Sequence, residues 1–239
     1  MSASSNDIHP ALRELASRAV GQPGLAQVRP AEARAGIEAR TASRPPGPPV
    51  ARVQELAIPG PRGSIPARLY DPGSAPGVVV AFHGGGWLMG SRDSFDAICR
   101  HLAVASGLMV VNVDYRLAPE HPFPAALDDA WAAVQWVAAQ GAERGWPADR
   151  MTVFGESAGG NLAAVCCLLA RDQGGPRISG QALVYPATDA RLIAPALDTY
   201  AEGFLQRAAD VRYAFETYAL DHGVPPDDWR LSPLLAPSH

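Results

Sequence analysis

Two kinds of hydrophobic pattern alternate through most of the chain. Short, continuous apolar runs at residues 77–83 and 108–114 are typical of central strands that are buried on both faces. Between the runs lie segments with apolar residues three or four positions apart, such as 128–140, which predict amphipathic helices. This alternation indicates an α/β fold with a mostly parallel sheet and helices on both faces. Further strands are expected at residues 151–154 and 181–185, and further helices at 93–106 and 161–171.

The first seventy residues follow a different pattern. Residues 9–20 and 30–40 each predict a helix, and the proline-rich stretch 44–49 predicts an extended linker. Residues 53–58 and 65–70 flank a Pro-Gly-Pro-Arg-Gly turn and predict an antiparallel hairpin. The two helices either pack on the main domain as structural elements or cover a substrate site, and the pattern favours neither. Near the other end, residues 200–220, which include Phe204 and Leu205, predict one or two amphipathic helices.

Composition narrows the class of protein. A chain of 239 residues can form one α/β domain with a sizeable core or two small ones. The net charge of −4 and the lack of a basic block give no indication of nucleic-acid binding.

Cysteine usage and the N-terminus bear on location. The three cysteines, Cys99, Cys166 and Cys167, are an odd number with two adjacent, which argues against a disulfide framework and fits a reducing compartment. Their spacing is not that of a metal site, so we expect no metal. The first ten residues lack the cationic start and apolar run of a signal peptide, and no apolar run has the length of a transmembrane helix. The sequence therefore predicts a cytoplasmic protein.

The first candidate for chemistry follows the expected strand at 151–154. Gly155-Glu156-Ser157-Ala158-Gly159 fits the pattern G-x-S-x-G, in which a serine lies on a strained strand-to-helix turn and its hydroxyl is exposed above the sheet. The helix that follows directs its N-terminal N–H groups to the place where negative charge develops during acyl transfer. Glycine, serine and alanine are also common in turns, so the motif alone is equally compatible with a plain strand–helix turn.

A glycine-rich loop strengthens the candidate. His83-Gly84-Gly85-Gly86-Trp87 directly follows the apolar run at 77–83, and its glycines leave the backbone free to direct several N–H groups to one point. Loops of this kind contribute to an oxyanion hole together with the residue after the nucleophile. The donors here would be Gly84, Gly85 and Ala158. A phosphate-binding loop is excluded because no Gly-Lys-Ser/Thr follows.

Together these motifs resemble those of a known family. The sequence contains His83-Gly84-Gly85-Gly86, Asp114-Tyr115-Arg116-Leu117-Ala118-Pro119-Glu120, Pro122-Phe123-Pro124-Ala125-Ala126 and Gly155-Glu156-Ser157-Ala158-Gly159-Gly160-Asn161. This combination closely resembles the bacterial hormone-sensitive-lipase-like esterases, from the N-terminal helices to the Ser232–Ala236 region. The resemblance implies an α/β-hydrolase fold with a two-part helical cap, hydrolysis of short-chain carboxylic esters, and no cofactor.

The resemblance also implies roles for single residues. Ser157 would be the nucleophile, and Gly84, Gly85 and Ala158 the oxyanion-hole donors. Glu156, His83 and Gly86 would support them, Glu156 by bracing the turn and His83 by bracing the glycine loop. Arg116 and Asp128 are more simply explained as an ion pair or helix cap than as catalytic groups.

A general base and its orienting acid are expected after the nucleophile in this fold. The family's acid and histidine segments do not occur in this sequence, and only His222 and His239 follow Ser157. His222 precedes a glycine, as in a helix C-terminus, and His239 is the last residue. His121 lies upstream in a proline-flanked loop. We therefore assign no triad acid or base and expect the chain to be C-terminally incomplete, without its last two strands, and severely impaired in activity.

The expected organisation is a helical cap segment and linker at residues 1–50 and a hydrolase core at 51–239, with 190–225 as the second part of the cap. Loss of the last strands would expose the edge at 181–185, where homo-oligomers could form. The partner would be a small-molecule ester. A non-catalytic small-ligand-binding protein of the same fold is the alternative, and amidase or deacetylase activity is not distinguished by the sequence.

Overall fold

The computed structural model describes residues 9–19, 21–202 and 206–238. Val20, Phe204, Leu205 and His239, which the sequence analysis mentioned, lie outside this part. Within it, six strands form one sheet in the order β1-β2-β4-β3-β5-β6. Strands β3, β4, β5 and β6 are parallel to one another, and β2 is antiparallel to both of its neighbours, β1 and β4. The predicted α/β fold with a mostly parallel sheet is confirmed.

Most strands lie within a residue or two of their predicted bounds. They are β1 (Arg52–Gly60), β2 (Gly63–Asp71), β3 (Val78–Phe82), β4 (Met109–Val113), β5 (Met151–Glu156) and β6 (Ile178–Val184). Strands β1 and β2 form the predicted hairpin, with Gly60 opposite Gly63. Strand β6 begins three residues before its predicted start, because Ser179 and Gly180 lack the apolar character that identifies a buried strand. Ser179 and Gln181 are exposed at this edge of the sheet.

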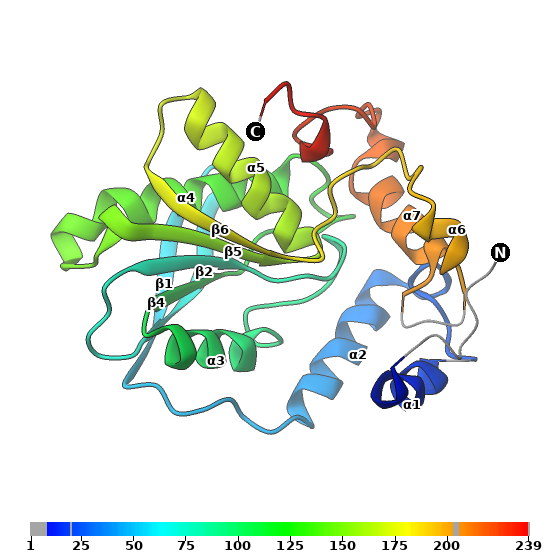
Figure 1. Cartoon of the computed structure of the whole chain (residues 1–239), viewed down its shortest axis with the longest axis horizontal. Helices are drawn as coiled ribbons and strands as arrows, with labels where there is room; N and C mark the ends of the chain where they lie inside the picture. Colours follow the sequence, from blue (N-terminus) through cyan, green and yellow to red (C-terminus); the bar gives the residue numbers. More distant parts are fainter. Residues whose placement is uncertain (1–8, 20, 203–205, 239) are drawn as a thin grey trace.

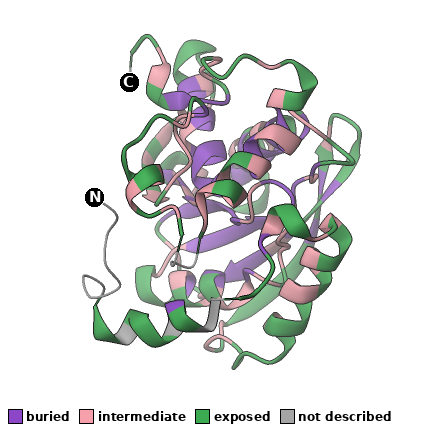
Figure 2. Cartoon of the chain, turned by 90° about the vertical axis from the view of Figure 1, so that its right-hand side faces the viewer, coloured by how far each residue is buried: buried purple, intermediate pink, exposed green. Residues whose placement is uncertain are grey.

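Helices cover both faces of the sheet. Helix α3 (Asp96–Ser106) lies on one side, and α4 (Ala125–Arg144) and α5 (Ala158–Asp172) lie on the other (Figure 1). Successive residues of β3 face opposite sides of the sheet. Val79 packs in the cluster with Cys99 of α3, whereas Val80 packs in the cluster that includes Leu162 of α5. Figure 2 shows the buried residues concentrated along the sheet and inner helices.

The remaining helices come from the two ends of the chain. They are α1 (Pro10–Ala19), α2 (Pro30–Ala42), α6 (Ala196–Thr199) and α7 (Ala208–Tyr218). In Figure 1 these four helices gather beside the sheet, at the end where α2 and α7 are labelled. Short 3₁₀ turns occur at Leu25–Gln27 (η2), Ala148–Arg150 (η3), Leu220–His222 (η4) and Pro233–Leu235 (η5). The backbone N–H of Ala26 donates to Oδ1 of Asp210 at 3.3 Å, and Arg207 donates to the carbonyl oxygen of Gln22. Among the described residues no helix has the length and apolar character needed to cross a membrane.

The predicted partner of Arg116 is wrong. Its guanidinium pairs with Asp129 rather than Asp128, with Nη2 2.8 Å from Oδ1 and Nε 2.8 Å from Oδ2. Helix α4 begins at Ala125, three residues before its predicted start, and it presents Asp129 to the core while Asp128 is exposed. The Asp129 side chain is 2% exposed, and it also accepts the backbone N–H of Arg116. The pair therefore fixes the chain after β4 to the start of α4.

Removing the buried carboxylate tests this connection. Asp129→Ala leaves Arg116 without its partner, so we expect the free energy of unfolding to fall by about 2 to 3 kcal/mol in urea denaturation. Asp128→Ala on the exposed neighbour is the matched control and is expected to change it by less than about 0.5 kcal/mol. Equal effects of the two substitutions would contradict the assignment.

Candidate active site

The turn after β5 holds Ser157 in an unusual backbone conformation. Its φ of 55° and ψ of −114° lie in a region that costs a non-glycine residue free energy, and such strain persists only where the surroundings enforce it. The backbone N–H of Ser157 donates to Val184 at 2.9 Å, and its carbonyl oxygen accepts from Ala187 and Asn161 at 3.1 Å each. The end of β6 and the first turn of α5 thus hold the serine at the tip of the turn.

The two glycines of the motif allow backbone to lie against backbone. A Cβ on Gly155 would stand 2.1 Å from the carbonyl oxygen of Gly159, and a Cβ on Gly159 would stand 2.1 Å from that of Phe82. Real Cβ atoms do not approach so closely, so glycine is required at both positions. This close contact also starts α5 at Ala158, three residues before its predicted start, despite the weak helix propensity of Gly159 and Gly160.

The glycine loop forms a tight turn beside the serine. Gly85 and Gly86 have φ values of 122° and 61°, and a Cβ on Gly85 would lie 2.1 Å from the carbonyl oxygen of Met89. The backbone N–H groups of Leu88 and Met89 both donate to the carbonyl oxygen of Gly85 at 3.1 Å. Trp87 also has a positive φ, of 60°, which its residue type did not predict. We call residues 84–89 the glycine loop.

Aromatic packing holds this loop from the side of α7. The Trp87 ring is 1% exposed and stacks on Tyr218, with centroids 4.5 Å apart and planes at 6°. Phe215 packs against the same ring at 5.1 Å. The loop position therefore depends on α7 as well as on the sheet.

His83 is buried at the start of the loop. Its Nδ1 lies 2.8 Å from the carbonyl oxygen of Gly84, and its ring stacks on Tyr115 with centroids 4.2 Å apart. The Tyr115 hydroxyl donates to the carbonyl oxygen of His83 at 2.6 Å. Burial lowers the pKa of His83 to about 4, so its imidazole is neutral near pH 7. Its Nδ1 then donates to the carbonyl oxygen of Gly84, and its Nε2 has no hydrogen-bond partner among the residues that the structure describes.

A cavity of about 970 Å³ opens above the serine. Of the predicted site residues, Gly85, Gly86, Glu156 and Ser157 line it, whereas His83, Gly84 and Ala158 are buried and do not. The rest of the wall comes from the start of the chain, the glycine loop, the end of β6 and α7: Gln22, Pro23, Gly24, Leu25, Val28, Glu32, Ala33, Gly36, Arg40, Met89, Tyr185, Gln206, Arg207, Asp210 and Ala214.

Glu156 lies between the glycine loop and the end of β6. A Cβ on Gly84 would stand 2.2 Å from Oε2 of Glu156, so this carboxylate touches the loop backbone. Burial, together with the nearby Glu156 carboxylate, raises the pKa of Tyr185. The sequence analysis missed Tyr185 as a wall residue. Its position directly after a parallel strand is the available signal, because ligands bind at the carboxyl ends of such strands.

None of the residues lining the cavity in the described part of the chain is a histidine. His121 and His222 are exposed, and Nε2 of His222 lies 3.2 Å from the carbonyl oxygen of Thr217. Gly223 follows with a φ of 77°, as predicted for the end of this helical segment. No cluster of three or more metal-ligating side chains occurs among the residues that the structure describes.

Comparison with known proteins places this geometry in a family. A family model described as alpha/beta hydrolase fold matches residues 79–239. The chain therefore belongs to the α/β-hydrolase fold family, and the predicted resemblance to esterases is confirmed.

Several relatives carry names that describe ester hydrolysis. The chain is 45% identical over 201 residues to carboxylic ester hydrolase LipN of Mycobacterium tuberculosis, covering 81% of this chain and 54% of LipN. It is 39% identical over 182 residues to ethyl acetate hydrolase of Pseudomonas putida, covering 72% and 56%. The chain spans about half the length of these curated relatives.

Solved structures agree over nearly the whole chain. An α/β-hydrolase enzyme from the metagenome of Lake Arreo matches with a TM-score of 0.89 and 35% identity, covering 98% of this chain and 76% of that one. The thermostable carboxylesterase EstE1 from a metagenomic library matches with a TM-score of 0.80 and 38% identity, covering 87% and 73%.

The buried neutral state of His83 has a consequence for stability against pH. Its folded pKa of about 4 lies below the ordinary value of 6.5, so its contribution is complete above pH 6.5 and is lost as pH falls toward 4. We expect this group to account for about 3 kcal/mol of the loss in unfolding free energy between pH 7 and pH 4.

Urea denaturation of the His83→Phe variant at both pH values measures this contribution. Phenylalanine keeps an aromatic ring against Tyr115 but does not titrate, so the loss between the two pH values is expected to shrink. The exposed His101→Phe serves as the control. An unchanged loss in His83→Phe would show that His83 does not carry this pH dependence.

Proposed function

We propose that the protein is a carboxylic ester hydrolase in which Ser157 is the nucleophile and the backbone N–H groups of Gly84, Gly85 and Ala158 form the oxyanion hole. The observation that supports this most is the strained Ser157 at the start of α5, lining the same cavity as Gly85. The fifteen-residue helix α5 directs its N-terminal dipole toward the serine, where it stabilises developing negative charge.

The reaction proceeds in two halves. The Ser157 hydroxyl oxygen attacks the ester carbonyl, a base takes its proton, and the tetrahedral oxyanion is held by the loop and helix N–H groups. Each such donor contributes about 3 kcal/mol of transition-state stabilisation. The alcohol leaves with a proton, and water then attacks the acyl-serine to release the acid. Glu156 braces the turn, and His83 and Gly86 shape the loop.

A serine hydroxyl is a weak nucleophile without a base. The described wall of the cavity contains no histidine. The carboxylate of Glu156, the residue before Ser157, is in contact with the Gly84 backbone. We therefore expect the 239-residue chain to hydrolyse esters only slowly, with residual catalysis from the oxyanion hole and substrate binding.

The walls of the cavity support a two-part cap. We assign residues 1–50 and 190–225 to this cap and 51–239 to the core that carries it, because residues from 22–40 and 206–214 supply most of the lining. Gly36 lies in the middle of α2, where a Cβ would meet only the Arg40 guanidinium at 3.4 Å. There is open space at this part of the cavity wall, and the proposed occupant is a small-molecule ester with a short acyl chain.

The proposed location is the cytoplasm. Cys99, Cys166 and Cys167 are free thiols, as expected of a protein from a reducing compartment. Burial raises the pKa of Cys99 and Cys166, so both are neutral and behave as small apolar core residues.

The alternative is a small-ligand-binding protein without turnover. It is favoured by the lack of a histidine among the described wall residues of a large cavity. Saturable binding of a short-chain ester with no acid release would support it over hydrolysis.

Ser157→Ala separates the two functions. We expect the wild-type chain to release p-nitrophenol from p-nitrophenyl butyrate slowly, and Ser157→Ala to lower that rate by at least about 10-fold because the acylated oxygen is gone. Liquid chromatography of the released acid gives an independent readout. A rate that Ser157→Ala leaves unchanged would contradict the proposed nucleophile, and rapid turnover would contradict the expected impairment.

The outer edge of β6 supports a further proposal, that two copies of the chain associate through it. Strand β6 pairs with β5 alone among the described strands, so its outer backbone groups lack a strand partner. Such edges pair readily with another chain.

Lysine on an edge strand opposes this pairing. We expect the wild-type mass in multi-angle light scattering to rise from monomer toward dimer with concentration, and Ala182→Lys to remain monomeric. Val104→Lys, on the exposed face of α3, is the matched control. A wild-type chain that is monomeric at all concentrations would contradict the proposed association.

A further inference from the structure

Arg34 reaches from α2 to two loops of the core. Its Nε donates to the carbonyl oxygen of Leu88 at 2.7 Å, and its Nη2 donates to that of Ala118 at 2.8 Å. The same guanidinium forms a bidentate pair with Glu120, with Nη1 2.9 Å from Oε1 and Nη2 2.6 Å from Oε2. The Arg34 side chain is 28% exposed, and its hydrogen bonds hold the pKa of Glu120 below the ordinary value.

The two carbonyl groups belong to segments that are already joined. Leu88 is part of the glycine loop, where its N–H donates to Gly85. The N–H of Ala118 donates to the carbonyl oxygen of Trp87 at 2.9 Å. Arg34 therefore connects α2 to the glycine loop in two ways. One connection is through Leu88, which bonds to Gly85, and the other is through Ala118, which bonds to Trp87.

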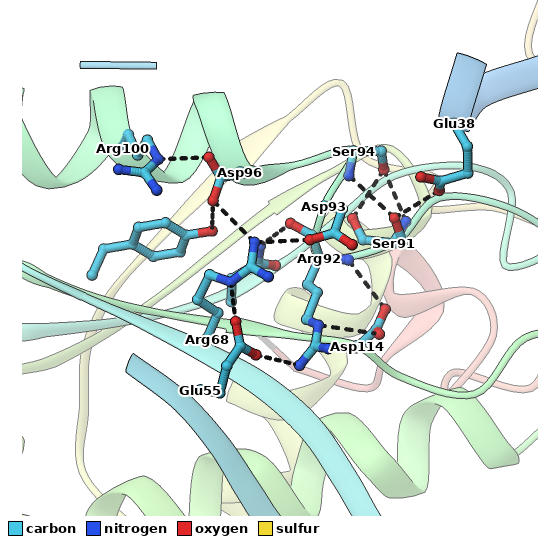
Figure 3. Close-up of polar contacts among 12 residues, drawn as sticks. Glu38, Glu55, Arg68, Ser91, Arg92, Asp93, Ser94, Asp96, Arg100 and Asp114 are labelled. Atoms are coloured by element: carbon cyan, nitrogen blue, oxygen red, sulfur yellow. Dashed lines mark hydrogen bonds and ion pairs between the residues drawn. The ribbon is translucent and has the colours of Figure 1, made fainter. Parts of the chain in front are cut away.

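Helix α2 depends on such polar contacts because it contributes no buried residue of its own. Its second contact is one helical turn further on, where Oε1 of Glu38 accepts a hydrogen bond from the Ser91 hydroxyl at 2.9 Å (Figure 3). Ser91 follows the glycine loop by two residues. The hydrogen bonds of Arg34 with Glu120 and of Glu38 with Ser91 thus attach one side of α2 to the segments around the loop. Other residues of the helix line the cavity, namely Glu32, Gly36 and Arg40.

Charge and geometry favour the Arg34 contact over the Glu38 contact. A guanidinium presents its donors in a fixed fork that suits a bidentate carboxylate and two carbonyl groups at once, so Arg34 makes four hydrogen bonds where Ser91 and Glu38 share one. The Ser91 hydroxyl makes one hydrogen bond to an exposed carboxylate. Loss of Arg34 would release both Leu88 and Ala118, and of the hydrogen bonds described between α2 and these segments the one between Ser91 and Glu38 would remain.

We propose that Arg34 is a positioning residue that couples the seating of α2 over the cavity to the position of the glycine loop. When α2 is seated, the guanidinium holds the Leu88 carbonyl and with it the turn that directs the Gly85 N–H toward the cavity. When α2 moves away, the loop loses this restraint. The consequence for catalysis rests on the proposed esterase function, whereas the coupling itself does not.

Hydrogen exchange measures the coupling without any need for turnover. The amides of Leu88, Met89 and Ala118 are hydrogen-bonded in and beside the loop and serve as reporters. In Arg34→Met we expect these amides to exchange about 10-fold faster, while the amide of Val80 in β3 is unchanged. Arg29→Met is the matched control, because Arg29 is the N-cap residue of the same helix and its guanidinium, among the contacts described, pairs with the exposed Glu32.

Two further variants keep the test decisive. Arg34→Lys retains a charge and donors but not the fork, so an exchange rate between those of wild type and Arg34→Met is expected. Glu120→Gln leaves Arg34 in place and covers the case in which Arg34→Met does not fold; it is expected to raise exchange at Ala118 and Leu88 to a smaller extent. Unchanged reporters in Arg34→Met and Glu120→Gln, or an equal rise at the reporters and at Val80, would overturn the proposal.

Residual ester hydrolysis tests the catalytic consequence. If Arg34 positions an oxyanion donor, Arg34→Met lowers kcat for p-nitrophenyl butyrate and leaves KM unchanged, since the donor acts in the transition state. A loss confined to KM would mean that α2 only shapes the cavity, and would overturn the positioning role. A chain without any Ser157-dependent hydrolysis would count against the esterase function, and the exchange result would then decide the coupling alone.

Discussion

Three backbone segments touch without side chains between them where β3, β5 and α5 meet. The Cα of Gly159 lies against the Phe82 carbonyl, and Gly155 lies against Gly159. This contact fixes where α5 begins and forces the chain at Ser157 through a strained turn. The surrounding core, with Ala158 and Leu162 fully buried, offsets the cost of that strain. Any side chain at either glycine would separate helix from strand and relax the serine.

The glycine loop is held by groups of three different origins. His83 and Tyr115 stack beneath it within the core, Trp87 packs on Tyr218 of α7, and Arg34 of α2 binds the Leu88 carbonyl. Two of these three anchors come from elements that also line the cavity. The loop is therefore not an independent part of the core, and its geometry reflects how both covering elements are seated.

Local features were readable from the sequence, and distant contacts were not. The hairpin, the buried strands, the serine turn and the glycine loop each depend on a few consecutive residues, so their patterns identified them. The partner of Arg116 depends on which side of α4 faces the core, and the helix presents Asp129 there rather than Asp128. Arg34 carries no local signal that distinguishes it from an ordinary surface residue, because its contacts are with segments more than fifty positions away in the sequence. Tyr185 could have been identified only from its place at the carboxyl end of a parallel strand.

The join between the start of the chain and α7 sets an order for folding during synthesis. Ala26 and Asp210 are 184 positions apart, so the ribosome must translate all six strands before this contact can form. Contacts of such sequence separation form late, after the closure of long loops. The sheet and its serine turn can form first. Helix α2 has no buried residue of its own, so we expect it to pack against the core only later. The walls of the cavity can therefore close only after the strands have been made, and until then the nascent chain exposes Ser157.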